Sequence, residues 1–306
     1  MKRYVAAGIT DPALQSSYEE CKRLNALHGK TYYLATLLLP KSKRPHVHAL
    51  YGFARYADEI VDTYSEGSTP EERSETLRDF STRALADIER GASHDPILAA
   101  LVNTIQKYRI PHEYFRAFLE SMEMDLHKSR YANYGELEKY MYGSAAVIGL
   151  QMLPILGTVS DEAKNAAQRL GEAFQLANFI RDVSEDLYRG RIYLPLDELA
   201  KFGVTEADLF ARKLTPEIIE ALKFQISRVR SLQAEAAEGI PFLDKVSQPC
   251  IEAASELYCG IVDEVERNGY EIFTKRAKTS TLRRLRVAIP AALRATVASR
   301  STTGAE

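Results

Sequence analysis

Apolar side chains recur at helical spacing along most of the chain. Leu170, Phe174 and Ala177, for example, follow one another three or four positions apart, and this spacing places them on one face of an α-helix. The alternation of apolar and polar residues that is typical of half-buried strands is scarce, and prolines stand between the periodic segments. With boundaries good to a few residues, the pattern predicts helices over 11–28, 31–39, 44–63, 70–91, 95–108, 111–127, 134–157, 161–187, 214–238, 244–268 and 281–297.

The connections between these segments contain no domain boundary. Residues 65–70 are rich in serine, glycine, threonine and proline, which indicates a loop, and 189–203 indicates a longer irregular connection. No break is long or polar enough to separate two domains. We therefore predict a single all-α domain over residues 1–306, with flexible ends at 1–10 and 298–306.

The first polar stripe of interest lies in the helix predicted over 44–63. Tyr51, Arg55, Asp58 and Asp62 recur four, three and four positions apart, beside an apolar stripe of the same spacing. The two carboxylates therefore lie one turn apart, about 6 Å along the helix axis, and point the same way. These four residues are called the first polar stripe.

The helix predicted over 161–187 repeats this arrangement. Gly171 begins a polar stripe that continues, at spacings of four, three, four and four positions, through Gln175, Asn178, Asp182 and Asp186. This second polar stripe also ends in two acids one turn apart.

Like charges one turn apart repel each other on a helix, so two such pairs beside apolar stripes indicate a bound cation. Carboxylate oxygens without cysteine or histidine suit Mg²⁺, which in proteins often bridges carboxylates to substrate phosphates. Basic residues that could bind an anion flank both stripes: Lys30, Arg55, Arg181, Arg189 and Arg191. The alternative is a solvated acidic face, with Arg55 merely pairing with Asp58 or Asp62. The presence of two matched stripes favours a binding site over a solvated acidic face.

Composition narrows the class of protein. The chain has 40 basic and 42 acidic residues and a net charge of −2, which lacks the basic excess typical of nucleic-acid-binding proteins. Its three cysteines form no CxxC motif, so they indicate no disulfide framework. The first nine residues lack the apolar core of a signal peptide, and no run of 18 apolar residues occurs. We therefore expect a cytoplasmic protein.

Long segments around both stripes resemble the motifs of a known enzyme family. The matching segments, in chain order, are 28–40, 49–62, 122–126, 140–149, 175–186, 189–195 and 254–258. Together they resemble the squalene/phytoene synthase family over about residues 17–290, nearly the whole chain. Within that family, 28–36 and 140–149 are most similar to phytoene synthases of the actinobacterial type.

The resemblance implies an isoprenoid (terpenoid) synthase fold, a single all-α prenyl diphosphate condensing domain around a central cavity. It implies a Mg²⁺-dependent prenyltransferase, in which Mn²⁺ could substitute. Two geranylgeranyl diphosphates would condense head to head, through a cyclopropylcarbinyl (prephytoene) diphosphate, to phytoene, releasing diphosphate in carotenoid biosynthesis. NADPH is not expected, because proton loss rather than reduction would end the reaction.

The resemblance also implies roles for individual residues. Asp58 and Asp62 would bind Mg²⁺ at one diphosphate, and Asp182, Asp186 and Asn178 would do so at the other. The four aspartates would be catalytic, together with Tyr140 and Tyr258 in the cavity near the reacting carbons. The residues implied in substrate binding are Lys30, Tyr51, Arg55, Gln175, Asn178, Arg181 and Arg191. Periodicity alone indicates only that Tyr258 is a core residue, and it favours a structural ion pair for the acid at Asp125.

Two departures from the family pattern leave alternatives open. Glu59 stands where many members have a second aspartate, and Ser144 begins a change in a helix that lines the cavity. The second change leaves the length of the prenyl donor open. The alternatives are a dehydrosqualene or squalene synthase that uses farnesyl diphosphate, a terpene cyclase, and a non-catalytic subunit on the same scaffold.

The last helix suggests where the protein works. Residues 283–300 are basic and amphipathic, and such a helix can dock either on the protein itself or on an anionic membrane. A C40 product carries a transfer free energy of about 0.8 kcal/mol per CH₂, so release into water is unfavourable. We therefore expect reversible peripheral contact with the inner face of the membrane, and a downstream desaturase is a candidate partner.

Overall fold

The computed structural model of this chain describes residues 2–62, 69–158 and 160–303. Within these ranges the regular structure is helical, and extended pairing is limited to two isolated bridges. The prediction of an all-α chain is confirmed. The helices are α1 (Lys2–Ala6), α2 (Pro12–His28), α3 (Lys30–Thr36), α4 (Arg44–Asp62), α5 (Pro70–Arg90), α6 (Leu98–Tyr108), α7 (Glu113–His127), α8 (Tyr134–Met141), the π-helical turn η1 (Tyr142–Ala146), α9 (Val147–Leu156), α10 (Ala163–Tyr188), α11 (Leu196–Lys201), α12 (Glu206–Phe210), α13 (Pro216–Ala237), the short turn η2 (Ile240–Phe242), α14 (Gln248–Cys259), α15 (Ile261–Arg267) and α16 (Thr281–Thr303).

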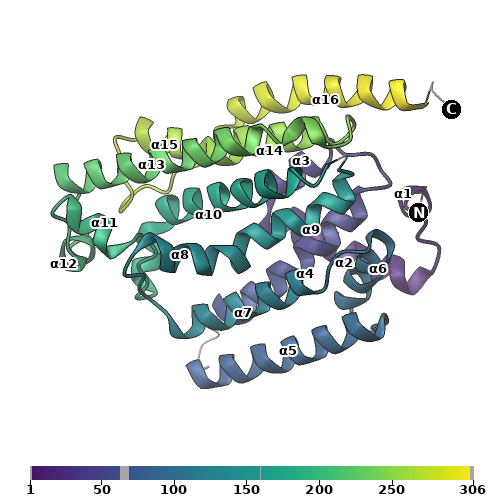
Figure 1. Ribbon diagram of the computed structural model, residues 1–306, viewed down its shortest axis with the longest axis horizontal. Coiled ribbons are helices and arrows are strands. Elements are labelled where there is room, and N and C mark those ends of the chain that lie inside the picture. The colour runs from purple at the N-terminus through teal and green to yellow at the C-terminus, as the bar shows by residue number, and fades with distance from the viewer. Residues whose placement is uncertain (1, 63–68, 159, 304–306) are drawn as a thin grey trace.

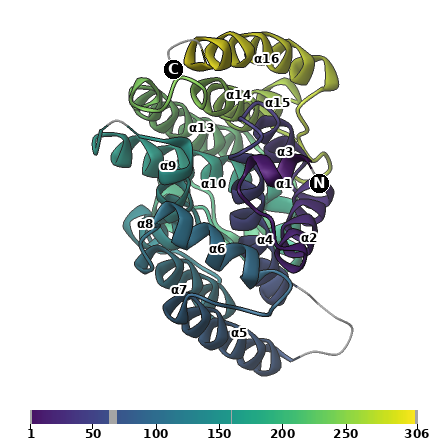
Figure 2. The same ribbon diagram turned by 90° about the vertical axis from the view of Figure 1, so that its right-hand side faces the viewer.

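Helix α10 lies in the middle of a stack of helices (Figure 1). It packs against α13, α14 and α15 on one side and against α9 and η1 on the other. Helix α16 lies along α14 as the outermost helix at one end of the stack, and α5 packs on α7 at the other end (Figures 1 and 2). Helices α2, α4 and α6 pack against one another. Both helices that carry a polar stripe, α4 and α10, therefore lie inside the stack.

Side chains at the helix ends account for where several helices begin and stop. Asp11 accepts a hydrogen bond of 2.9 Å from the backbone N–H of Leu14 and so caps α2. Thr69 and Glu72 cap α5 reciprocally, and α5 stops at Gly91, whose φ of 74° ends the helix without steric strain. These local signals are the reason why the predicted boundaries agree closely with the observed ones.

Two of the predicted helices are divided. The helix predicted over 134–157 contains the wide turn η1, where a Cβ on Gly143 would lie 2.3 Å from the carbonyl oxygen of Ala117 in α7. The helix predicted over 244–268 divides at Gly260 into α14 and α15, and a Cβ there would lie 2.5 Å from the guanidinium of Arg283. At Gly143 the approach of the α7 backbone requires glycine, whereas at Gly260 the close neighbour is the end of a flexible arginine side chain, which can move.

Some stretches that the sequence predicted to be irregular or flexible form helices in the structure. The connection 189–203 includes α11, in which Leu199 is buried, so the expectation of an irregular segment is wrong there. The N-terminal segment forms α1 and buries Tyr4 and Ile9, and α16 continues to Thr303. One or two buried side chains hold each of the short helices, which is too few to produce a periodic pattern in the sequence.

The interior is apolar, and its cysteines are free. Two hydrophobic clusters fill it, one centred on α2, α4, α6 and α7 and the other on α10 and α13. The three cysteines are buried as free thiols. Among the described residues, every helix is too short or too polar to cross a membrane.

One buried histidine makes stability depend on pH. His46 is fully buried on α4, where its Nδ1 lies 3.0 Å from the hydroxyl oxygens of Tyr18 and Thr104. Burial lowers the pKa of His46 from its usual 6.5 to about 3. Between these two values the unfolded chain binds a proton that the folded chain does not bind, so stability decreases as the pH falls.

We expect the free energy of unfolding to decrease by about 1.4 kcal/mol per pH unit below pH 6.5 because of His46. His46→Gln keeps a hydrogen-bonding side chain but does not titrate, so its slope between about pH 6.5 and pH 5 should be flatter. Urea unfolding of both proteins at several pH values measures the two slopes. Equal slopes would show that His46 is not the group responsible.

Candidate active site

The two polar stripes border one partly open cavity. It has a volume of about 250 Å³, and its walls are contributed by α2, α3, α4, α9, α10, α14 and the segment after α13. Most of the lining side chains are apolar, but Tyr51 of the first stripe and Gln175 of the second also line it. The sequence prediction of a central cavity beside the stripes is therefore supported by their positions.

Small residues create the space. Gly171 of α10 packs so closely on η1 that a Cβ would lie 2.4 Å from the carbonyl oxygen of Ala145. Gly149 approaches Ala167 in the same way, at 2.2 Å from its carbonyl oxygen. These two backbone contacts fix α10 against η1 and α9, and the small side chains along their shared wall, such as Ala166, leave room for a ligand.

In the first stripe the arginine pairs with the acid that follows it. Arg55 Nη1 lies 2.7 Å from Asp58 Oδ2, and its Nε lies 4.0 Å from Glu59 Oε2. The Asp58 side chain is 47% exposed, so a ligand can reach it from solvent. Asp62 ends α4, and its side chain lies outside the described residues. The pairing that the sequence left open as an alternative is thus present between Arg55 and Asp58.

In the second stripe the two acids differ in their surroundings. Asp182 accepts hydrogen bonds from Nε of Arg181 at 2.7 Å and Nε of Arg276 at 2.9 Å. Burial alone would raise the pKa of Asp182, but these two arginines outweigh it and lower the pKa. For Asp186, burial and then the charge of Asp182 raise the pKa to about 8, against the opposing effect of Arg189 and other arginines. Additional positive charge near Asp186 would favour its carboxylate form.

The second stripe also contains an unsatisfied oxygen. Asn178 Oδ1 is buried and has no hydrogen-bond partner, one turn before Asp182. An amide oxygen and two carboxylates are the ligand types that Mg²⁺ prefers. Among the described residues, however, no three acidic, histidine or cysteine side chains converge on one point. The stripe therefore offers suitable oxygen atoms without gathering them into a single cluster.

Arg191 is held by the acid for which the sequence favoured a structural ion pair. Its Nη1 lies 3.1 Å from Asp125 Oδ2, and the hydroxyl of Tyr193 donates to Asp125 Oδ1 at 2.7 Å. Tyr140 packs on the ring of Tyr193, with centroids 5.8 Å apart, and also on Phe179. Tyr140 is not one of the residues that line the cavity. Its predicted position near the reacting carbons stays a prediction.

Tyr258 lies behind an aromatic wall of the cavity. Its ring centroid is 4.6 Å from that of Tyr32 and 4.7 Å from that of Phe174, and both partners line the cavity. Burial would lower the pKa of the Arg181 guanidinium, but the hydrogen bond to Asp182 and then the nearby Tyr258 outweigh it and raise that pKa. The tyrosine therefore connects the cavity wall to the second stripe. Lys30, by contrast, is exposed at the first residue of α3.

Sequence reasoning missed several residues of this region. Arg276 reaches Asp182 from the connection before α16, across 94 positions of the chain. Its only sequence signal is a run of basic residues that does not indicate which acid it meets. Asn25 and Ser144 line the apolar cavity, and their buried side-chain polar atoms have no hydrogen-bond partners. Asn25 stands in no stripe that would have revealed it, whereas Ser144 was noted in the sequence as a departure in a helix expected to line the cavity.

The unpartnered amide of Asn25 should reduce stability, because a buried polar group without a partner costs about 1–3 kcal/mol. Asn25→Leu, which has a similar volume, should therefore raise the free energy of unfolding by about that amount. The matched control is Thr36→Val in the same cavity wall, where the hydroxyl already donates to the carbonyl of Tyr32 at 2.7 Å and no gain is expected. Urea unfolding measures both. A loss of stability in Asn25→Leu would mean that the amide has a partner.

Comparison with known proteins shows which family this chain resembles in sequence. A model of the squalene/phytoene synthase family matches residues 26–283. The chain is 39% identical over 300 residues to the phytoene synthase of Arthrospira platensis, covering 94% of this chain and 96% of that relative. It is 38% identical over 285 residues to the chloroplastic phytoene synthase 1 of Arabidopsis thaliana, covering 91% of this chain. The chain spans 66% of the length of this plant relative.

Solved structures share the architecture. A dehydrosqualene synthase in complex with a ligand superposes with a TM-score of 0.83 at 27% identity, covering 91% of this chain and 96% of that one. The squalene synthase of Alicyclobacillus acidocaldarius superposes with a TM-score of 0.78, also at 27% identity, covering 88% of this chain and all of that one. The prediction of the isoprenoid synthase fold is confirmed.

Proposed function

The chain belongs to the squalene/phytoene synthase family, and we propose that it is a phytoene synthase of carotenoid biosynthesis. It joins two geranylgeranyl diphosphates head to head to form phytoene and releases both diphosphates. The observation that carries this proposal is an apolar cavity whose wall includes Tyr51 and Gln175, residues of the two stripes that also present carboxylates and arginines. Identity to named phytoene synthases over nearly the whole chain supports the choice of product.

The proposed reaction uses two parts of the site, a polar part that binds diphosphate and an apolar part that surrounds the prenyl chains. Arg55 and Arg181 bind diphosphate oxygens and stabilise negative charge as the C1–O bond of one donor breaks. The resulting C1 cation adds to the 2,3 double bond of the other donor, and proton loss gives the cyclopropylcarbinyl diphosphate. Loss of the second diphosphate, rearrangement and a final proton loss give the hydrocarbon. Apolar walls exclude water from the cations, and the faces of Tyr32 and Phe174 stabilise them.

We propose Mg²⁺, or Mn²⁺ in its place, as the cofactor. Asp58 and Asp62 would hold it at one diphosphate, and Asn178, Asp182 and Asp186 would hold it at the other. Bound there, the metal would supply positive charge to the leaving diphosphate. The buried unpartnered oxygen of Asn178 and the raised pKa of Asp186 support a cation at the second stripe. NADPH is not required, because the reaction ends in proton loss.

Product analysis tests the proposed function directly. Purified protein incubated with geranylgeranyl diphosphate and Mg²⁺, without NADPH, should yield phytoene in the extracted lipids. A parallel incubation with farnesyl diphosphate, with and without NADPH, tests the dehydrosqualene and squalene alternatives. A C30 product made in preference would move the enzyme to the shorter donor, a cyclic product would indicate a terpene cyclase, and no hydrocarbon from either donor would refute the proposal.

Removing one carboxylate from either stripe should abolish most turnover without unfolding the protein. We expect Asp58→Asn and Asp182→Asn each to lower kcat/KM by at least about a hundredfold, as losses of transition-state charge stabilisation do. Asp79→Asn makes the same chemical change at an exposed position of α5, away from the cavity, and should leave kcat/KM unchanged. Steady-state kinetics with circular dichroism of each variant is the measurement. Near-normal turnover in either stripe variant would contradict the site assignment.

Metal binding can be measured without turnover. Mg²⁺ together with inorganic diphosphate should raise the melting temperature of the wild-type protein, since a ligand at about one hundred times its Kd adds about 2.7 kcal/mol of stability. Asp79→Asn should show the same shift, and Asp182→Asn a smaller one. An equal shift in Asp182→Asn would place the metal elsewhere.

We propose further that the protein works in peripheral contact with the inner face of the membrane. A C40 hydrocarbon is far more stable in lipid than in water, at about 0.8 kcal/mol per CH₂. The reaction that consumes such a product is an oxidation in the same lipid phase, so a desaturase is the proposed downstream partner.

A further inference from the structure

Helix α16 turns its large apolar side chains toward solvent. Leu282 is 60% exposed, Leu285 51%, Ile289 58% and Leu293 65%. They follow one another three or four positions apart, so they lie on one face of the helix. We call these four residues the outer face of α16. Val297 continues this face one turn further and is exposed as well. A docked helix normally buries such a face against its own protein.

The face that α16 does bury is made of small residues. Ala291 is fully buried and Ala295 nearly so, and α16 packs along α14 (Figure 1). The sequence left open whether this basic, amphipathic segment docks on the protein or on a membrane. In the structure, α16 packs on the protein through alanines. Its leucines and isoleucine remain exposed and can contact another surface.

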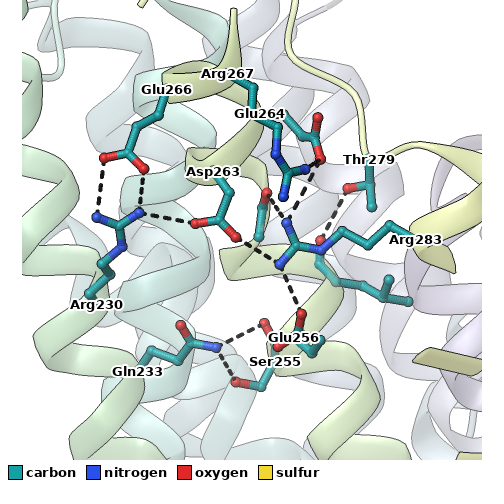
Figure 3. Close-up of polar contacts among 12 residues, drawn as sticks. Arg230, Gln233, Ser255, Glu256, Asp263, Glu264, Glu266, Arg267, Thr279 and Arg283 are labelled. Atoms are coloured by element: carbon teal, nitrogen blue, oxygen red, sulfur yellow. Dashed lines mark hydrogen bonds and ion pairs between the residues drawn. The ribbon is translucent and has the colours of Figure 1, made fainter. Parts of the chain in front are cut away.

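An ion-pair network fixes this orientation. Arg283 Nη2 lies 2.7 Å from Asp263 Oδ2 and 2.8 Å from Glu256 Oε1 (Figure 3). Asp263 also pairs with Arg230 of α13 at 3.1 Å, which ties α16 to two further helices. A second pair, between Arg294 and Glu252, joins α16 to α14 at 3.0 Å. Contacts along the helix, at Arg283 and at Arg294, oppose a rotation that would bury the outer face.

The charge of α16 indicates what covers that face. Between Thr281 and Thr303 the helix contains five arginines and no acidic residue, although the chain as a whole has a net charge of −2. Arg283 and Arg294 are paired with acids of α14 and α15, and a second copy of α16, which has no acidic residue, would offer exposed Arg286 no partner. An anionic surface would instead be attracted, and exposed Arg286 adjoins the outer face.

We propose that the outer face of α16 binds an anionic lipid bilayer, with the helix lying in the plane of the interface. Leu282, Leu285, Ile289 and Leu293 enter the boundary between headgroups and acyl chains, and Arg286 binds lipid phosphate. This proposal rests on the membrane contact proposed above and assigns that contact to the outer face of α16. It requires no particular prenyl donor or product.

The bound surface would lie one helix away from the cavity. Helix α14 packs against α16 and also contributes Ile251 and Ala254 to the cavity wall. Lipid docked on α16 is therefore separated from the prenyl chain by α14. The proposed surface includes no residue of either polar stripe, because both stripes lie on α4 and α10.

Flotation with lipid vesicles and no substrate tests the proposal. We expect the wild-type full-length chain to float with vesicles of phosphatidylcholine containing about one third phosphatidylglycerol, and much less with pure phosphatidylcholine. Ile289→Ser should weaken binding about tenfold. The matched control is Leu27→Ser on α2, a side chain of almost equal exposure, 56% against 58%, which should bind as wild type does.

A second pair of variants tests the charge. Arg286→Gln should reduce binding to the anionic vesicles, whereas Arg116→Gln removes one exposed arginine from α7 and should not. Melting temperatures and turnover in detergent should be unchanged in all four variants. Vesicle binding can therefore be absent from a protein that forms phytoene, and it can be present in a protein that does not form it.

Three outcomes would overturn the proposal. The first is no flotation of the wild-type chain at low or moderate salt. The second is equal weakening by Ile289→Ser and Leu27→Ser, which would place the contact outside α16. The third is a stable dimer, seen by sedimentation, that Ile289→Ser dissociates while vesicle binding is unaffected, because the outer face would then bind a second copy.

Discussion

Two carboxylates one helical turn apart, both withdrawn from water, are the constraint on which the arrangement of this site depends. Asp182 is only 17% exposed, and it is kept ionised by arginines from α10 itself and from the connection before α16. Burial first, and then the negative charge of Asp182, raise the pKa of Asp186 to about 8. Burying a charge costs several kcal/mol unless an opposite charge accompanies it. The cation proposed to accompany the diphosphate would supply the opposite charge that this pair of acids lacks.

The cavity depends on a second constraint, the close approach of backbones. Gly171 and Gly149 bring α10 against η1 and α9, and any larger side chain at either position would force these helices apart. The same helix thus has to be tightly packed on one side, open to a ligand on another and charged along a third. Small residues satisfy the first two requirements together, because they shorten the distance between helices and leave the wall of the cavity unfilled.

These constraints explain how far the sequence predicts the structure. The stripes of α4 and α10 repeat at helical spacing, so Asp58, Gln175 and Asp182 could be placed from local pattern alone, as could the all-α fold. The contact of Arg276 with Asp182 joins positions 94 apart, and no periodicity encodes it. Short α11 was missed because too few residues contribute to its pattern. The position of Tyr140 depends on packing against Tyr193, a nonlocal contact. Roles in metal and substrate binding came from family resemblance and stay predictions.

The wall of the cavity and the outer face of α16 both consist mainly of apolar side chains. The first lines a cavity inside the protein, and the second faces solvent. A carbocation survives only where water is excluded, so the proposed reaction needs apolar walls, and the proposed C40 product is itself insoluble in water. At about 0.8 kcal/mol per CH₂, no aqueous route out of the cavity is favourable for such a product. An enzyme that forms this product needs an apolar destination for it close to the cavity. Helix α14 contributes to the wall of the cavity and also packs against α16, so a single helix separates the cavity from the proposed lipid-binding surface.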